Sequence, residues 1–598
     1  MIKVRKRNGS LEEFNWNKID SAVEKAFTAF DREVPKMVSE IVHDTIQLKH
    51  KGQEVIDIED IQDDVVKSII AAGEWDVALA YHSYREKHKE LRFIKDRVDW
   101  IDKYMESKEN AATSSETDAN ANVSIKNVAN IDGEVYKSIN RQIQRYRMTK
   151  QLEKQFPEVA KQYVKDLEHH IIYAHDEASS PAVKNYCEAV SLYPLLVEGT
   201  KGMDGLGTVA PKNLSSFCGQ LVNLTFLLSA QCKGAVAFGE FFNFLDYFCV
   251  KDFGPDYHKH AKSMCASMLP YRTIEKAIHQ AYQQIVYGWN QPAGNRSYQS
   301  PFTNISYYDS NYWHALFDDF YFPDGTQPVW ERIDWLQRDF MQWFNNERTK
   351  TLLTFPVETV ALLSEDGDIK DKEWKEFTAE MYSKGHSFFT YISDNPNALA
   401  SCCRLRNEIA ENVFSFTNGL TGVQTGSANV ITLNLNRIIQ DWWNSVNKAV
   451  MDNGVEITVV SPDWKLEDFA YKGSIKAYLI NILERVYKYH IAYKTLLYEV
   501  EDAGMLNAST AGYISMHKLF STIGINGLNE AAEFLGIKCN YNEEYKEFCR
   551  LITGTIAEQN RLHSTKDFQF NTELVPAEGL SSKNYGWDKS DGLEPMAI

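Results

Sequence analysis

An apolar run that ends at Asn-Pro and is followed by two adjacent cysteines is the most constraining feature of this sequence. Residues 387–392 read Ser-Phe-Phe-Thr-Tyr-Ile, and this pattern predicts a buried strand that stops before Pro396. Cys402 and Cys403 then stand at the start of the next loop or turn, and a second alternating apolar run covers residues 429–438. Adjacent cysteines rarely bridge each other, because so tight a ring is strained. The pair is therefore either redox-active, with at most one partner elsewhere in the chain, or two small buried hydrophobic residues.

The composition and charge of the chain exclude several classes of protein. At 598 residues, of which 44% are hydrophobic, the chain has room for a large core and more than one domain. Its formal net charge of −18 argues against a nucleic-acid surface. Because no apolar run is long enough to cross a bilayer and the basic N-terminus lacks an apolar signal core, we expect a cytoplasmic protein without a membrane partner. The 9 cysteines are scattered without a CxxC pair, so we expect neither a disulfide framework nor a metal site in this chain.

The sequence pattern of residues 1–98 predicts a compact α-rich domain that begins with a β-hairpin. Residues 4–9 give a strand ending in an Asn-Gly turn, residues 12–14 return as its partner, and a helix follows that Asn15 or Asn17 caps. Basic side chains of this domain are placed to converge on a polyphosphate, namely Lys6, Arg7, Lys18 and Arg85. The alternative is that they form an ordinary solvated basic face.

A polar and simple stretch separates this domain from the rest of the chain. Residues 107–123 are rich in Ser, Thr, Asn and Ala, a composition that cannot bury a core and is typical of a linker. We therefore expect an N-terminal domain at residues 1–98, a linker at 99–125 and one large domain at 126–598. The three nearby histidines at 169, 170 and 175 do not predict a metal site, because strand alternation places the first and last too far apart to share an ion.

Three segments resemble motifs of the anaerobic ribonucleoside-triphosphate reductases, glycyl-radical enzymes with a ten-stranded α/β barrel. The segments are Ser401-Cys402-Cys403-Arg404-Leu405, residues 425–438 and Val575-Pro576-Ala577-Glu578-Gly579. The N-terminal pattern Val-x-Lys-Arg-x-Gly, with Ala80-Tyr81-x-x-Tyr84-Arg85 at a distance, resembles an ATP-cone. The resemblance implies a catalytic α/β barrel at residues 126–598. It also implies an α-rich regulatory domain that senses ATP against dATP through the four basic side chains named above.

The resemblance further implies thiyl-radical chemistry. Cys403 becomes the thiyl radical, at the tip of a loop inside the barrel, and abstracts the 3′-hydrogen of a ribonucleoside triphosphate so that the 2′-hydroxyl leaves as water. Residues 211–223 are similar to the family's substrate strand, where Cys218 reduces the substrate radical, and Glu578 is the candidate general base on the 3′-oxygen. Taken alone, Cys218 is buried filler and Glu578 is an exposed acid. The substrate-binding residues implied are Ser216, His175, Asn304 and Ser427.

Two positions depart from the formate-using members of that family. Ser427 stands where those members carry asparagine, and Cys402 stands where they have glycine. Formate is therefore in question as the reductant. A thiol route, with Cys402 as an extra redox thiol, is the alternative.

The family's C-terminal region is not found after Gly579. Members end with a four-cysteine zinc site and a loop that carries the glycyl radical, so we expect both to reside in a segment outside this chain, either a separate polypeptide or a missing piece. Activation then needs a radical-SAM activase with an iron-sulfur cluster, and we expect a homodimer or a higher oligomer. Two rival functions stay open: an enzyme of pyruvate formate-lyase type, which has no reason to sense ATP and dATP, and a non-catalytic nucleotide-binding protein.

Overall fold

The computed structural model of the chain divides into two compact units, Met1–Lys108 and Glu109–Ile598. The residues that it describes are 3–5, 11–53, 55–106, 128–206, 208–264, 273–293, 299–394, 398–400, 406–408, 424–452, 469–573 and 578–595. Within these ranges, no helix has the length and apolar character needed to cross a membrane.

The first unit joins a small sheet to four helices. Strand β1 (Lys3–Arg5) pairs antiparallel with β2 (Leu11–Glu13), the predicted hairpin, and parallel with β3 (Val55–Asp57), which sequence reasoning missed. The helices are α1 (Trp16–Thr28), α2 (Lys36–Lys49), α3 (Ile58–Ala71) and α4 (Trp75–Glu106). Of the two predicted cap residues, Asn15 caps α1, and its side chain accepts a hydrogen bond of 2.9 Å from the Asn17 amide. The predicted domain end at residue 98 falls inside α4, which continues to Glu106.

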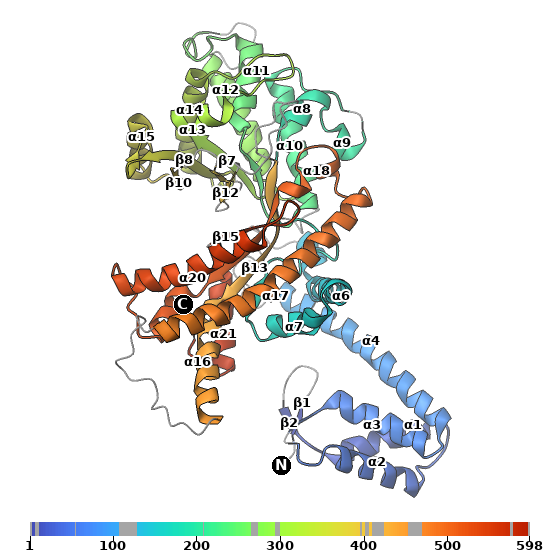
Figure 1. Ribbon diagram of the computed structural model, residues 1–598. Helices are drawn as coiled ribbons and strands as arrows, with labels where there is room; N and C mark the ends of the chain where they lie inside the picture. Colours follow the sequence, from blue (N-terminus) through green and yellow to red (C-terminus); the bar gives the residue numbers. More distant parts are fainter. Residues whose placement is uncertain are drawn as a thin grey trace. The chain divides into compact units, whose positions relative to one another are not determined.

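The second unit is built on a ten-stranded sheet with the order β10-β8-β7-β6-β5-β13-β14-β15, to which β4 and β9 are added beside β13 and β8 (Figure 1). Strands β5, β6, β7, β8 and β10 run parallel to their neighbours in this order, and so do β13, β14 and β15, whereas β9 pairs antiparallel with β8. The two halves meet antiparallel at β5 and β13. This arrangement confirms the predicted ten-stranded α/β fold. The strands are β4 (Ile172–Ala174), β5 (Cys187–Ala189), β6 (Val236–Phe238), β7 (Thr303–Tyr308), β8 (Val357–Glu365), β9 (Asp368–Ile369), β10 (Phe389–Ser393), β13 (Thr425–Asn434), β14 (Leu519–Asn526) and β15 (Gln569–Glu573).

Helices cover both halves of this sheet. Figure 1 shows α17 (Phe469–Asp502) and α20 (Glu543–His563) running along the β13–β15 half. The remaining helices are α5 (Val128–Glu134), α6 (Lys137–Gln155), α7 (Pro157–Glu168), α8 (Tyr193–Glu198), α9 (Lys201–Asp204), α10 (Leu214–Gln231), α11 (Phe241–Phe253), α12 (Ile274–Trp289), α13 (Ser310–Phe317), α14 (Trp330–Arg348), α15 (Lys372–Ser383), α16 (Leu435–Asp452), α18 (Asn507–Thr510), α19 (Leu528–Phe534) and α21 (Glu578–Ser590). One continuous apolar core runs between helices and sheet. A short antiparallel pair, β11 (Ala398–Ala400) and β12 (Arg406–Glu408), forms a separate two-stranded sheet that contacts β8 and β15.

One predicted segment has a different structure. Residues 211–223 are similar to the family's substrate strand, but Leu214 begins helix α10, and the reason lies in local chemistry. The Asn213 side chain accepts from the Ser216 amide while Ser216 bonds back to the Asn213 amide, which is a capping box. Leu214, Phe217, Cys218 and Leu221 are then buried at helical spacing.

Candidate functional site

A buried polar cluster marks the line where the two halves of the sheet meet. Ser427 of β13 lies opposite Cys187 of β5 in the antiparallel register. The Ser427 hydroxyl is 3.0 Å from the hydroxyl of Thr522 on β14, and all three side chains are buried. The Cys187 sulfur accepts a hydrogen bond of 3.3 Å from the Ala235 amide. A cysteine thiol is thus held beside two hydroxyls on one face of the sheet.

Gly426 permits this close meeting of β5 and β13. Its φ of +147° is a conformation that L side chains rarely adopt, and a Cβ atom built there would lie 2.2 Å from the carbonyl oxygen of Cys187. Any larger residue would push β5 away from β13.

Asn304 lies on the same face of the sheet. The register aligns Asn304 of β7 with Ala237 of β6, and that residue with Ala189 of β5, two positions from Cys187. Asn304 is fully buried, and among the described residues neither its amide nitrogen nor its amide oxygen has a hydrogen-bond partner. Because an unsatisfied buried amide costs about 1–3 kcal/mol, this side chain is suited to bind a ligand.

His175 extends the polar cluster beyond β4. Its Nε2 atom is 2.7 Å from the Thr432 hydroxyl of β13, and its backbone amide donates to the Val430 carbonyl at 3.2 Å. Burial lowers the pKa of His175 to about 4, so the imidazole is neutral near pH 7. A neutral ring presents one donor and one acceptor nitrogen, which suits hydrogen bonding to hydroxyl groups.

The two predicted site residues on α10 lie away from this cluster. The Ser216 hydroxyl accepts from the Lys212 and Asn213 amides, each at 3.1 Å, and is used in capping the helix. Cys218 is fully buried in the apolar core, and this burial raises the pKa of its thiol to about 12. The cysteine that the sheet places beside Ser427 is Cys187, which sequence reasoning missed. The alternating segment Tyr186-Cys187-Glu188-Ala189-Val190, which follows shortly after His175, could have indicated a strand that carries this cysteine.

Other predicted site residues fall outside what the structure describes. Cys402 and Cys403 lie in the sequence between β11 and β12 and are outside the described residues, as are Lys6 and Arg7. Glu578 is the first residue of α21, and its side chain is likewise outside the description.

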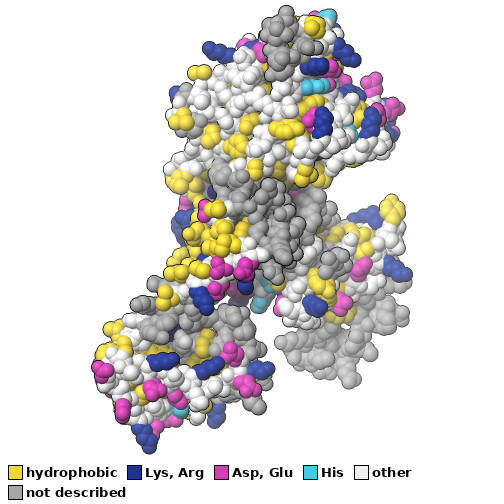
Figure 2. All heavy atoms as spheres, turned by 180° about the vertical axis from the view of Figure 1, so that it is seen from behind, with side chains coloured by type: hydrophobic (Ala, Val, Ile, Leu, Met, Phe, Trp, Pro, Cys, Tyr) yellow, Lys and Arg dark blue, Asp and Glu magenta, His cyan; other side chains and the backbone are white. Residues whose placement is uncertain are grey.

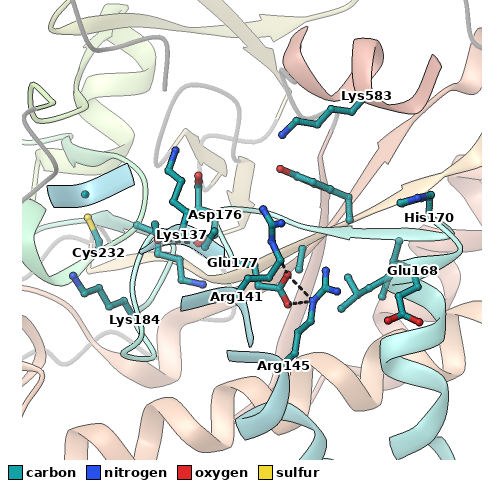
Figure 3. A pocket seen from close by; sticks show the side chains of 18 of the residues that line it. Lys137, Arg141, Arg145, Glu168, His170, Asp176, Glu177, Lys184, Cys232 and Lys583 are labelled. Atoms are coloured by element: carbon teal, nitrogen blue, oxygen red, sulfur yellow. Dashed lines mark hydrogen bonds and ion pairs between the residues drawn. The ribbon is translucent and has the colours of Figure 1, made fainter. Parts of the chain in front are cut away.

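A basic cavity of about 760 Å³ opens next to β4. It is lined by Tyr173 and Ala174 of β4, by Asp176 and Glu177 of the following loop, and by residues of α6, α10 and α21. Figure 3 shows Arg141 and Arg145 of α6 beside Glu177, with Lys583 extending from α21. The cations that line the cavity are Lys137, Arg141, Arg145, Lys184, Lys233 and Lys583, against the carboxylates Glu168, Asp176 and Glu177. The excess of positive charge favours an anionic ligand.

The carboxylate of Glu177 and the helix α21 fix the walls of this cavity. The Arg145 Nε atom donates to both oxygens of Glu177 at 3.1 and 3.0 Å. On the opposite wall, the rings of His170 and Trp587 stack with their centroids 3.9 Å apart. Helix α21 is anchored through Asp588, whose Oδ1 atom forms a buried ion pair with Nη2 of Arg437 at 2.6 Å.

The first unit has a cavity of its own, of about 700 Å³, between α1, α3 and α4. Lys18 and Arg85, two predicted effector ligands, both line it, together with Lys25, Gln62 and Tyr81. Lys18 Nζ is 2.9 Å from Glu12, and Arg85 forms ion pairs with Asp63 at 2.5 Å and with Glu59. On the face visible at the lower left of Figure 2, acidic and basic side chains are interspersed over this unit. An anion entering the cavity would therefore compete with carboxylates for its two predicted cations.

Comparisons with known proteins identify the same two parts of the chain. The family described as "Anaerobic ribonucleoside-triphosphate reductase" matches residues 129–593, and the family described as "ATP cone domain" matches residues 2–90. Two curated relatives are each 36% identical: "Ribonucleoside-diphosphate reductase subunit alpha" of Chlamydia pneumoniae over 108 residues and a "Vitamin B12-dependent ribonucleoside-diphosphate reductase" of Mycobacterium tuberculosis over 96 residues. Each match covers 16% of this chain and only 10% and 13% of the respective relative.

Solved structures extend the likeness to most of the chain. A structure of an "Anaerobic ribonucleotide reductase" superposes with a TM-score of 0.66 at 26% identity, covering 84% of this chain and 71% of that one. The anaerobic ribonucleotide reductase from Thermotoga maritima with dATP bound in the specificity site gives a TM-score of 0.63 at 25% identity, covering 78% and 72% of the two chains. Because the first family match spans most of the sequence, the chain belongs to the anaerobic ribonucleoside-triphosphate reductase family.

Proposed function

We propose that this chain reduces ribonucleoside triphosphates to deoxyribonucleoside triphosphates by thiyl-radical chemistry, under control of ATP and dATP bound to its first unit. The observation that carries the proposal is the register of β5 and β13, which brings the buried thiol of Cys187 beside Ser427 on the sheet of a reductase fold. Family membership favours this function over a pyruvate formate-lyase type of enzyme. The curated relatives are named diphosphate reductases, so the choice of triphosphate rests on the family match.

The proposed reductant of the substrate radical is Cys187, in place of Cys218. The thiyl radical of Cys403 takes the 3′-hydrogen, and the 2′-hydroxyl then leaves as water after gaining a proton. A thiol on the sheet face can supply that proton and an electron, whereas the Cys218 thiol is sealed in the apolar core. In the thiol route the two electrons come from two cysteines that end as a disulfide, and Ser427 at the position of the formate-linked asparagine supports this route. Glu578 remains the proposed base on the 3′-oxygen.

The basic cavity beside β4 is the proposed site for the triphosphate. Three phosphates carry a charge of roughly −4 near pH 7, and Lys and Arg side chains are the usual partners of such groups. One segment joins this cavity to the polar cluster. The cavity is lined by Tyr173, Ala174 and Asp176, and the intervening His175 hydrogen-bonds to Thr432 of β13 in the polar cluster. His175, Asn304 and Ser427 then bind the ribose or base.

Partner proteins supply the radical. A segment with a glycyl radical, and with its own zinc site, provides the oxidising equivalent, and a radical-SAM activase with an iron-sulfur cluster generates it. We also propose that the active form is a homodimer or a higher oligomer. In the first unit, ATP or dATP occupies the cavity lined by Lys18 and Arg85 and displaces the carboxylates from them.

The test is deoxynucleotide formation by the chain under anaerobic conditions, in the presence of a glycyl-radical segment and the activase. We expect Cys403→Ala and Cys187→Ser to lower turnover by at least a thousandfold. Cys218→Ala, the matched control, should retain most of the activity. Activity that survives in Cys187→Ser but not in Cys218→Ala would return the reducing role to Cys218. A Cys403→Ala chain that still supports growth would favour the non-catalytic nucleotide-binding protein.

A further inference from the structure

Helices α12 and α14 bring together three side chains that commonly bind metals. Glu275 lies in the first turn of α12 and His279 one turn later, a spacing that places both on the same face of the helix. Asp339 projects from α14, and one ligand atom from each of the three residues lies within 4.8 Å of the others. The His279 Nε2 atom is 3.1 and 3.0 Å from the two oxygens of Asp339.

These distances are close to those of a bound ion. Nitrogen and oxygen ligands at about 2.0–2.2 Å from a tetrahedral ion lie roughly 3.3–3.6 Å apart. The His279 and Asp339 atoms are already near that separation, and rotation of the Glu275 side chain would bring its oxygen in. All three residues are half-buried, so coordination positions toward solvent stay open to water.

A buried hydroxyl lies beside the cluster. Tyr282 is fully buried, and its hydroxyl interacts with the Asp339 carboxylate, which together with burial raises the pKa of Tyr282. A hydroxyl that interacts with a carboxylate ligand is the kind of outer-shell group that metal sites normally have. The ring of His279 is held between those of Tyr282 and Trp343, with centroids 5.6 and 6.3 Å away.

We propose that Glu275, His279 and Asp339 bind one divalent transition-metal ion, with zinc as the best fit, and that the ion clamps α12 to α14. An imidazole with two carboxylates suits zinc, whereas magnesium and calcium prefer oxygen ligands alone. Two carboxylates also balance the charge of a divalent ion. The site stands apart from the polar cluster of the sheet, and its role is to fix two helices of the second unit.

Metal titration of the full, metal-free chain tests the site. Co²⁺ is the probe because it reports the ligand set by visible absorption, and Zn²⁺ is then added in competition. We expect wild type to bind one more equivalent of metal than His279→Gln and Glu275→Gln, and we expect Zn²⁺ to raise the Tm of wild type but not the Tm of these two variants. Reading the difference between chains removes ions bound by cysteines, which all of these variants share.

His314 offers a matched control. It pairs with Asp318 at 2.7 Å on an exposed face of α13, but no third ligand is grouped with it among the described residues. His314→Gln should bind as much Co²⁺ as wild type. Glu275→Gln keeps the His279–Asp339 contact, so its folding is secure even if His279→Gln unfolds. If both α12 variants bind the full wild-type amount of metal, the cluster is only an ion pair with a neighbouring acid and the proposal fails.

Discussion

The buried ion pair that anchors α21 gives the sharpest stability prediction. Asp588 is fully buried, and its carboxylate accepts from Arg437 Nε at 3.0 Å, from Arg437 Nη2 at 2.6 Å and from Asn436 Nδ2 at 3.0 Å. In Asp588→Asn the Arg437 guanidinium loses its buried counter-charge. The amide NH₂ of the new side chain must also face a donor group of Arg437 or Asn436. Breaking a buried pair from one side costs about 3–5 kcal/mol. We therefore expect α21 to detach more readily while the rest of the second unit stays folded.

The control for this prediction uses the same guanidinium. Asp591 contacts Arg437 Nη1 at 2.7 Å, but its side chain is 48% exposed, so Asp591→Asn should cost less than about 1 kcal/mol. Replacing both Arg437 and Asp588 with apolar residues of similar size should recover most of the loss, because no charge is then left buried.

Hydrogen exchange measured by mass spectrometry is the appropriate assay, because it reads α21 separately from the remaining core. A loss of about 3 kcal/mol corresponds to roughly 150-fold faster exchange of α21 amides in Asp588→Asn. Equal exchange rates in Asp588→Asn and Asp591→Asn, or α21 protection that does not change in either, would refute the reasoning.

Three further predictions concern the site. Burial lowers the pKa of His175 to about 4, whereas in the unfolded chain its pKa is the usual 6.5. The unfolded chain therefore binds the proton first, and the free energy of unfolding falls as pH drops from 6.5 toward 4. In urea unfolding between pH 7.5 and 5.5, the free energy of unfolding of wild type should fall by about 1 kcal/mol more than that of His175→Gln. Gly426→Ala should separate β5 from β13 and abolish turnover, and a fully active Gly426→Ala enzyme would contradict the close approach of Gly426 to Cys187. The control is Gly554→Ala in α20, which has open space around it and should leave the Tm unchanged or raise it. Lys583→Gln should raise KM for the triphosphate several-fold with kcat little changed, and an unchanged KM in steady-state kinetics would remove the cavity beside β4 from the phosphate site.

Local features of this fold could be read from the sequence with good success. The Asn15 cap and the strand that ends before Pro396 each depend on residues within a few positions of one another. The error at residues 211–223 was avoidable, since Asn213 and Ser216 carry the spacing of a capping box.

The meeting points between distant segments could not be read in the same way. No local pattern pairs Cys187 with Ser427, because their contact depends on the register of strands from opposite halves of the chain. The same holds for Asp339, which joins Glu275 and His279 only through the packing of two helices. The i, i+4 spacing on α12 was visible, but it gains meaning only with the third ligand in place.

The antiparallel junction of β5 and β13 also bears on how the chain is made. At roughly 5–20 residues per second, the ribosome needs on the order of 10–50 seconds to extend the chain from Ala189 to Thr425. Throughout that interval the nascent half-sheet presents β5 as an open edge, where a neighbouring chain could pair in place of β13. The brevity of β5, three residues long, limits that hazard because so short an edge offers few backbone groups to an intruder.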